Sequence, residues 1–118
     1  MFKFVLLSFC ICIAFVSAAQ KISLNNTYTP SAKRGYFDWT VFINADAATL
    51  NSIDHVEYLL DPNFSKPQVS SSNRNTNFGY KANGWGEFQI KAKVFFKDKT
   101  KAVMYLTYWL TLKPRVVR

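Results

Sequence analysis

The chain has 118 residues, including 15 lysines and arginines against 7 aspartates and glutamates, and carries a formal net charge of +8 at pH 7. This length leaves room for one folded domain and excludes a second core of useful size. The positive charge keeps the chain soluble and favours acidic or neutral partners over basic ones.

Residues 1–19 have the three parts of a secretory signal peptide. Lys3 charges the N-terminal region, an apolar run covers residues 5–16, and small residues suitable for cleavage follow it. The run is shorter than the roughly 20 apolar residues that a membrane span needs. We therefore expect a secreted or periplasmic protein whose mature form has no transmembrane anchor.

Cys10 and Cys12 are the only cysteines, and both lie in this predicted leader. Neither follows a small residue in the way that a bacterial lipoprotein signal requires, so no lipid anchor is expected. The domain that remains, residues 20–112, has no thiol for a disulfide or a zinc–thiolate site. Packing must therefore stabilise this domain, which a basic tail at residues 113–118 follows.

Alternating apolar and polar residues predict strands along most of the domain. The longest candidates cover residues 37–43, 56–60, 88–97 and 103–110, and shorter ones cover 22–28 and 77–81. Residues 45–53 favour one turn of helix, 65–76 a long polar loop, and 98–101 a hairpin turn. Short strands separated by turn signals predict an all-β domain in which two antiparallel sheets form a sandwich.

Two segments place aromatic rings where glycine, proline and asparagine bend the chain. They are Asp61-Pro62-Asn63-Phe64 and Gly84-Trp85-Gly86-Glu87-Phe88. Each follows a predicted strand, so we expect both loops at one end of the sandwich. There, Phe64 and Trp85 can enclose a flat group, while backbone amides of the turn between Gly84 and Gly86 donate to a carbonyl. The alternative is that these rings only close the end of the core.

These loops belong to a longer pattern. Residues 37–43 (FDWTVFI), 53–67 (IDHVEYLLDPNFSKP) and 84–88 (GWGEF) together resemble a YEATS domain of the prokaryotic type, from about Tyr36 to Leu112. The resemblance implies an immunoglobulin-like antiparallel β-sandwich. It also implies a binding module, since eukaryotic members of the family read acylated lysines through an aromatic cage at the end of the sheets. We do not expect an enzyme, because the sequence has one histidine and no nucleophile-elbow signature.

The resemblance assigns a role to each matching position. It makes Phe64 and Trp85 the sandwiching rings, Phe88 a lining residue, Gly84 the site of a close backbone turn, and the Trp85 amide a donor to the acyl carbonyl. Asp61 stands where the family has histidine, and Asn63 where it has serine or threonine. Asparagine can still bond an amide, whereas the aspartate adds charge and favours a cation. The predicted ligand-binding residues are Asp61, Asn63, Phe64, Gly84, Trp85, Gly86 and Phe88.

Two other functions remain open. The domain can be a structural or adhesive module of the cell envelope that acts through sheet edges or through the lysines of residues 88–97. It can also be a hydrolase in which Asp61 and Glu87 form an acid–base pair. His55 is the only histidine, so no metal or cofactor is expected. The expected partner is an acylated or acidic envelope component or protein segment; nucleic acid is not expected, and the protein is expected to be a monomer.

Overall fold

The structure is a computed structural model that describes residues 21–112. The predicted signal peptide at residues 1–19 and the predicted basic tail at residues 113–118 lie outside this described part. Within it, no helix is both long enough and apolar enough to cross a membrane.

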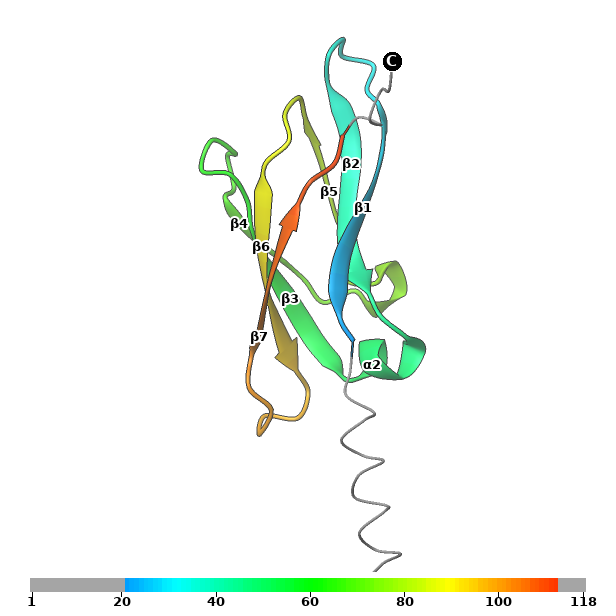
Figure 1. The fold of residues 1–118 in the computed structure, drawn as a ribbon, viewed down its shortest axis with the longest axis vertical. Helices are drawn as coiled ribbons and strands as arrows, with labels where there is room; N and C mark the ends of the chain where they lie inside the picture. Colours follow the sequence, from blue (N-terminus) through cyan, green and yellow to red (C-terminus); the bar gives the residue numbers. More distant parts are fainter. Residues whose placement is uncertain (1–20, 113–118) are drawn as a thin grey trace, which may run out of the picture.

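Two antiparallel sheets face each other (Figure 1). One has three strands in the order β1-β2-β5, and the other has four in the order β4-β3-β6-β7. Their bounds are β1 Ser23–Pro30, β2 Phe37–Asn44, β3 Ile53–Leu59, β4 Gln68–Ser71, β5 Tyr80–Gly84, β6 Gln89–Phe96 and β7 Met104–Trp109. The predicted all-β sandwich of two antiparallel sheets is confirmed.

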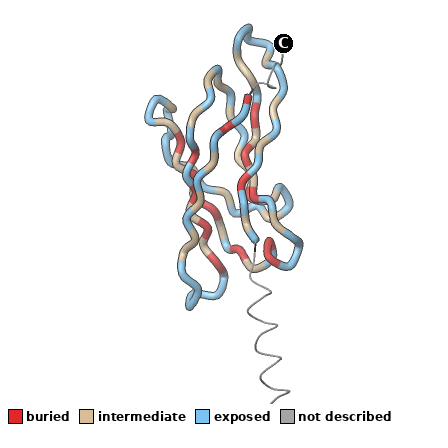
Figure 2. Tube along the Cα trace, viewed as in Figure 1, coloured by how far each residue is buried: buried red, intermediate tan, exposed pale blue. Residues whose placement is uncertain are grey.

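The alternation of side chains along the strands places the core between the sheets. In β2, Trp39, Val41 and Ile43 are buried, and in β6 every second residue from Ile90 to Phe96 is buried. Figure 2 shows these buried positions alternating with exposed and half-buried ones along the trace. A one-residue slip would turn either apolar face towards water, so the burial itself fixes the register of the strands.

Polar contacts tie the two sheets together. The Tyr58 hydroxyl in β3 donates to the carbonyl of Phe78, just before β5, at 2.6 Å. Along the opposite side, the Tyr108 hydroxyl in β7 donates to Oδ1 of Asn26 in β1 at 2.6 Å, and Asn26 Nδ2 donates to the carbonyl of Thr111 at 2.8 Å. Both long sides of the sandwich therefore carry a hydrogen-bonded link.

A short helix, α2 (Ala47–Asn51), joins β2 to β3 and confirms the helical turn expected within residues 45–53. Its N-cap is Asp46, whose carboxylate accepts a hydrogen bond from the Thr49 amide at 2.7 Å. This bond favours the charged carboxylate and lowers the pKa of Asp46. The cap satisfies an amide that the first turn of the helix leaves unpaired.

The prediction of one long polar loop over residues 65–76 is wrong. The segment contains strand β4 and a 3-10 helix, η1 (Arg74–Thr76). Strand β4 pairs with β3 at the edge of its sheet, from Leu59 opposite Gln68 to Val56 opposite Ser71. An edge strand tolerates serines because one of its faces is open to water, so a loop-like composition did not reveal the strand.

The strand predicted over residues 77–81 is misplaced. Asn77 and Phe78 have φ angles of 54° and 56°, which lie in the left-handed region and cannot continue a strand. Strand β5 begins at Tyr80 and runs to Gly84. The apolar side chain of Phe78 favoured a strand in the prediction. In the structure Phe78 lies in a turn, and its ring is buried in the core.

Candidate functional site

The two aromatic loops meet at the end of the sandwich opposite α2 (Figure 1). One connects β3 to β4, and the other connects β5 to β6. Strands β3, β4 and β6 belong to the four-stranded sheet, where β3 pairs with β6, and β5 belongs to the three-stranded sheet. Strand pairing and the packing of the two sheets together bring the loops to one end. A third segment, the residues just before β2, reaches the same end because Phe37 pairs with Gly84 at the end of β5.

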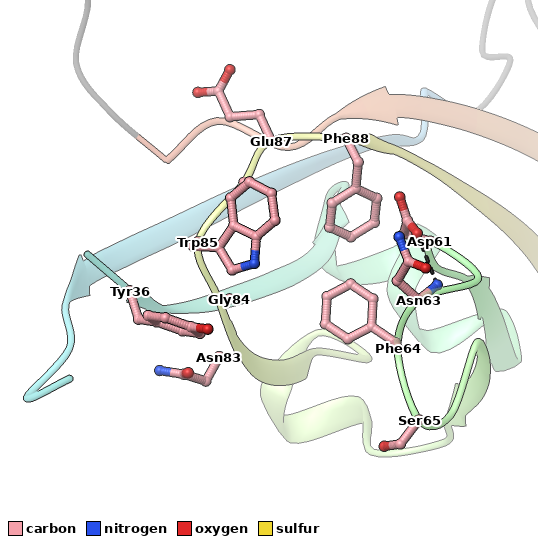
Figure 3. Close-up of a pocket in the computed structure, with 11 residues that line it drawn as sticks. Tyr36, Asp61, Asn63, Phe64, Ser65, Asn83, Gly84, Trp85, Glu87 and Phe88 are labelled. Atoms are coloured by element: carbon pink, nitrogen blue, oxygen red, sulfur yellow. Dashed lines mark hydrogen bonds between the residues drawn. The ribbon is translucent and has the colours of Figure 1, made fainter. Parts of the chain in front are cut away.

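These segments surround an open cavity of about 340 Å³. The lining residues are Tyr36, Asp61, Asn63, Phe64, Ser65, Asn83, Gly84, Trp85, Gly86, Glu87 and Phe88 (Figure 3). All seven residues that the sequence predicted for ligand binding are among them. The lining includes two carboxylates and no lysine, arginine or histidine, so its charge is opposite in sign to that of the chain as a whole.

The loop after β3 is held by its own hydrogen bonds. Oδ1 of Asp61 accepts from the Asn63 amide at 2.9 Å, and the Asp61 carbonyl accepts from the Phe64 amide at 3.0 Å. The Leu60 amide donates to the carbonyl of Pro67 at 2.7 Å and closes the base of the loop. The bond from the Asn63 amide to the Asp61 side chain forms an Asx turn, which fixes that side chain at the rim and directs the Phe64 ring towards the cavity (Figure 3).

Two aromatic rings, Phe64 and Phe88, form the wall on this side, and Trp39 supports them from the core. The Phe64 and Phe88 centroids are 5.3 Å apart, and each ring packs edge-on against Trp39, at 6.2 Å and 6.0 Å. Trp39 is fully buried, and its Nε1 has no hydrogen-bond partner among the described residues. Phe64 and Phe88 are half-buried, so one part of each ring packs on the core while another faces the cavity.

Trp85 lies on the other side of the space. Figure 3 shows its indole across the cavity from Phe64 and Phe88. The side chain is 70% exposed. The space between the rings is open, so these rings do not fill the end of the core. The rings form a slot. Phe64 and Phe88 make one wall, which packs on the core, and Trp85 makes the other wall, which is exposed to solvent.

The two glycines of the second loop differ in their surroundings. A Cβ atom at Gly84 would lie 3.5 Å from Nε1 of Trp39 and 3.7 Å from Cζ of Phe64, which is ordinary contact distance, whereas one at Gly86 would meet nothing within 4 Å. Neither has a positive φ; among the described glycines only Gly35 does. Gly84 therefore leaves space beside the aromatic wall, and its backbone does not require glycine.

Glu87 lines the cavity, but its carboxylate is bonded elsewhere. Oε1 accepts from Nε1 of Trp109 at 3.1 Å, and Oε2 accepts from the Leu112 amide at 3.0 Å. In Figure 3 the carboxylate points away from Asp61 and from the cavity. An acid–base pair of Asp61 and Glu87 needs both carboxylates to face one substrate, and this geometry does not favour it.

The structure adds three lining residues that sequence reasoning missed: Tyr36, Ser65 and Asn83. Nζ of Lys33 lies 4.0 Å from the centre of the Tyr36 ring. Nδ2 of the Asn83 side chain donates to Oδ1 of Asp38 at 2.8 Å. Tyr36 precedes β2 directly, so the pairing of β2 with β5 brings it beside Trp85. Only that register reveals Tyr36 as part of the site.

His55 lies on the outer side of the four-stranded sheet. Its ring stacks on Phe95 with centroids 4.3 Å apart, and its Nδ1 is 2.7 Å from Oδ2 of Asp54. The hydrogen bond with His55 is the main cause of the lowered pKa of Asp54. In residues 21–112, no group of three or more histidine, cysteine, aspartate or glutamate side chains is arranged to hold a metal ion.

Comparisons with known proteins agree with this geometry. The model of the prokaryotic YEATS domain family matches residues 37–108, which is more than half of the chain. None of the curated proteins matches the sequence.

Solved YEATS domains share the fold. A Yaf9 YEATS domain described as recognising a succinylated histone H3 peptide is 24% identical, with a TM-score of 0.64, and the match covers 81% of this chain and 77% of that one. Another, bound to an acetylated histone H3 peptide, is 23% identical, with a TM-score of 0.64 and coverage of 82% and 76%. The yeast AF-9 homolog Yaf9 is 24% identical, with a TM-score of 0.65 and coverage of 81% and 74%.

Proposed function

Because this chain belongs to the prokaryotic YEATS domain family, we propose that it is a binding module without catalytic activity, which holds an acylated side chain of an extended protein segment in the cavity between its aromatic loops. The observation that carries the proposal is the open cavity of about 340 Å³ with Phe64 and Phe88 on one side and Trp85 on the other. A flat amide fits between such rings, while its alkyl part is removed from water.

The solved relatives support the chemical class of the ligand. Yaf9 YEATS domains are described with succinylated and acetylated histone H3 peptides. For this chain we propose an acylated segment outside the cytoplasm, since residues 1–19 have the composition of a signal peptide. Within the cavity, the Trp85 amide is the proposed donor to the acyl carbonyl, and Asn63 is the proposed contact of the acyl amide.

The test uses short peptides that carry one acetyl-lysine or crotonyl-lysine in an acidic context, with the unacylated peptides as references. We expect Trp85→Ala to weaken binding about tenfold or more, as the loss of an aromatic contact at the centre of an interface does. Its melting temperature should stay close to that of the wild type, because the ring is 70% exposed. Titration calorimetry and thermal denaturation measure the two quantities.

A matched control and a second variant make this test specific. Tyr105→Ala removes a ring that is 71% exposed and lies outside the cavity lining, and it should leave peptide affinity unchanged. Gly84→Ala places a methyl group beside Phe64 and should weaken binding. The proposal is overturned if no acylated peptide binds better than its unacylated counterpart, or if Trp85→Ala and Tyr105→Ala behave alike.

A further inference from the structure

Strand β7 carries an exposed aromatic surface away from the cavity. Large hydrophobic side chains are conspicuously exposed at three described positions, and two of them, Tyr105 (71%) and Trp109 (57%), lie on this strand. They are four residues apart on one strand, so both point to the outer side of the sheet, about 13 Å from each other. Exposed rings grouped in this way are typical of a binding surface.

Lysines stand directly beside these rings. In the register of β6 and β7, Lys93 is opposite Tyr105, Lys91 is opposite Thr107, and Gln89 is opposite Trp109. Opposed residues point to the same face of a sheet. Neither Lys91 nor Lys93 forms an ion pair with a residue of the described part. We call Lys91, Lys93, Tyr105 and Trp109 the lysine–aromatic face.

The acids near this surface already have polar partners. Oδ1 of Asp98, in the turn between β6 and β7, accepts from the amide and the hydroxyl of Thr100 at 3.0 Å and 2.7 Å. Glu57, opposite Lys93 in β3, lies 3.5 Å from the Gln68 amide nitrogen and 3.8 Å from Nε2 of His55. Residues 89–109 contain five lysines and one aspartate, so the hairpin presents a positive field.

One ring of the surface is fixed before any partner arrives. Nε1 of Trp109 donates to Oε1 of Glu87 at 3.1 Å, which holds the edge of the indole while its flat side remains exposed. A ring held in one orientation loses little conformational entropy when a partner stacks on it.

We propose that the lysine–aromatic face binds an acidic polysaccharide, a chain whose sugar rings stack on Tyr105 and Trp109 while its carboxylates pair with Lys91 and Lys93. An extended chain can reach both rings, because they lie along one strand. The cations of this face are lysines without arginine, which is the residue preferred for recognising nucleic-acid phosphates. The signal-like composition of residues 1–19 also favours a polymer found outside the cytoplasm.

The test uses purified protein with polygalacturonate oligosaccharides as the acidic probe, dextran oligosaccharides as the neutral probe and single-stranded oligo(dT) as the competing polyanion. Titration calorimetry should show binding to polygalacturonate and none to dextran. Tyr105→Ala should weaken this binding roughly three- to tenfold through lost stacking. Replacing both lysines (Lys91→Gln with Lys93→Gln) should weaken it at low salt and reduce its dependence on salt.

Trp85→Ala is the matched control, since it removes an equally exposed ring that lines the cavity and not this face. It should leave polygalacturonate affinity unchanged, which separates this surface from the proposed acyl site. The proposal is overturned if dextran binds as tightly as polygalacturonate, or if oligo(dT) binds more tightly. It is also overturned if neither Tyr105→Ala nor the double lysine variant changes the affinity for polygalacturonate. A melting temperature near that of the wild type identifies a folded variant. We expect one for each, because Tyr105 and Lys91 are exposed and Lys93 is half-buried.

Discussion

Asp61 decides the local charge of the cavity. Glu87, the other carboxylate of the lining, directs its oxygens to Trp109 and Leu112. Asp61 is held at the rim by the hydrogen bond from the Asn63 amide, so its charge stays close to any group that enters. This carboxylate should attract a cationic group, have little effect on a neutral acyl group, and repel an acidic one.

We therefore expect Asp61→Asn to strengthen binding of a succinyl-lysine peptide by roughly three- to tenfold, with little change for the acetyl-lysine peptide. Asparagine keeps the Oδ1 acceptor of the Asx turn, so the loop should retain its shape. Competition titrations at low and high salt provide the measurement, and the gain should shrink as salt screens the charge. An equal gain for the neutral acetyl group would show that loop shape and not charge had changed.

At the scale of elements, the contact between β3 and the turn before β5 supports the fold beneath the site. Tyr58 is fully buried, and its hydroxyl bonds the carbonyl of Phe78, a residue whose φ of 56° lies in the left-handed region. Burial raises the pKa of the Tyr58 hydroxyl above its ordinary value, which keeps it protonated as a donor. The bond holds a turn that the local sequence does not favour.

Tyr58→Phe should lower the free energy of unfolding by about 1–2 kcal/mol, because the Phe78 carbonyl loses its buried donor. Urea denaturation measures the loss, with Tyr80→Phe as the control, since the Tyr80 hydroxyl has no hydrogen-bond partner among the described residues. The folded-state pKa of Tyr58 is raised, so its contribution is present below about pH 10 and declines as pH rises further. The difference in the free energy of unfolding between the wild type and Tyr58→Phe should therefore narrow above about pH 10. A difference that does not change with pH would contradict the role given to the Tyr58 hydroxyl.

At the scale of the whole molecule, the two sheets share one core. Residues from both sheets are buried together, and links such as Tyr108 to Asn26 join the sheets along their sides. The charges near the two surfaces differ: Asp61 lies at the rim of the cavity, while the β6–β7 hairpin carries five lysines and one aspartate. The proposed acyl site and the lysine–aromatic face therefore offer different electrostatic environments to different partners.

A shared core predicts a single cooperative unfolding transition. Far-ultraviolet circular dichroism, which follows the strands, and tryptophan fluorescence, which follows Trp39 in the core, should give the same urea midpoint. Trp85→Ala and Trp109→Ala variants remove the exposed indoles and simplify the fluorescence signal. Two separated midpoints would instead show that the sheets unfold independently.

The sequence by itself determined the class of the fold and most of the site. Strands such as β2 and β6 could be predicted because burial between two sheets imposes a period of two on their side chains. The loops that carry the seven predicted ligand-binding residues could be found because glycine, proline and asparagine mark them, and the resemblance to the YEATS family assigned most of the individual roles. Their binding role stays a prediction, as do the signal peptide and the export of the chain.

Only the tertiary structure decided the remaining features, because each depends on contacts between residues distant in the chain. Strand β4 is stabilised by pairing with β3, and Phe78 by the core and by Tyr58, so neither follows from local propensity. The pairing of β2 with β5 brings Tyr36 to the cavity, and the packing of both sheets sets Trp85 across from Phe64. The local pattern selects which residues can form a loop or a strand, whereas long-range packing selects which of them meet.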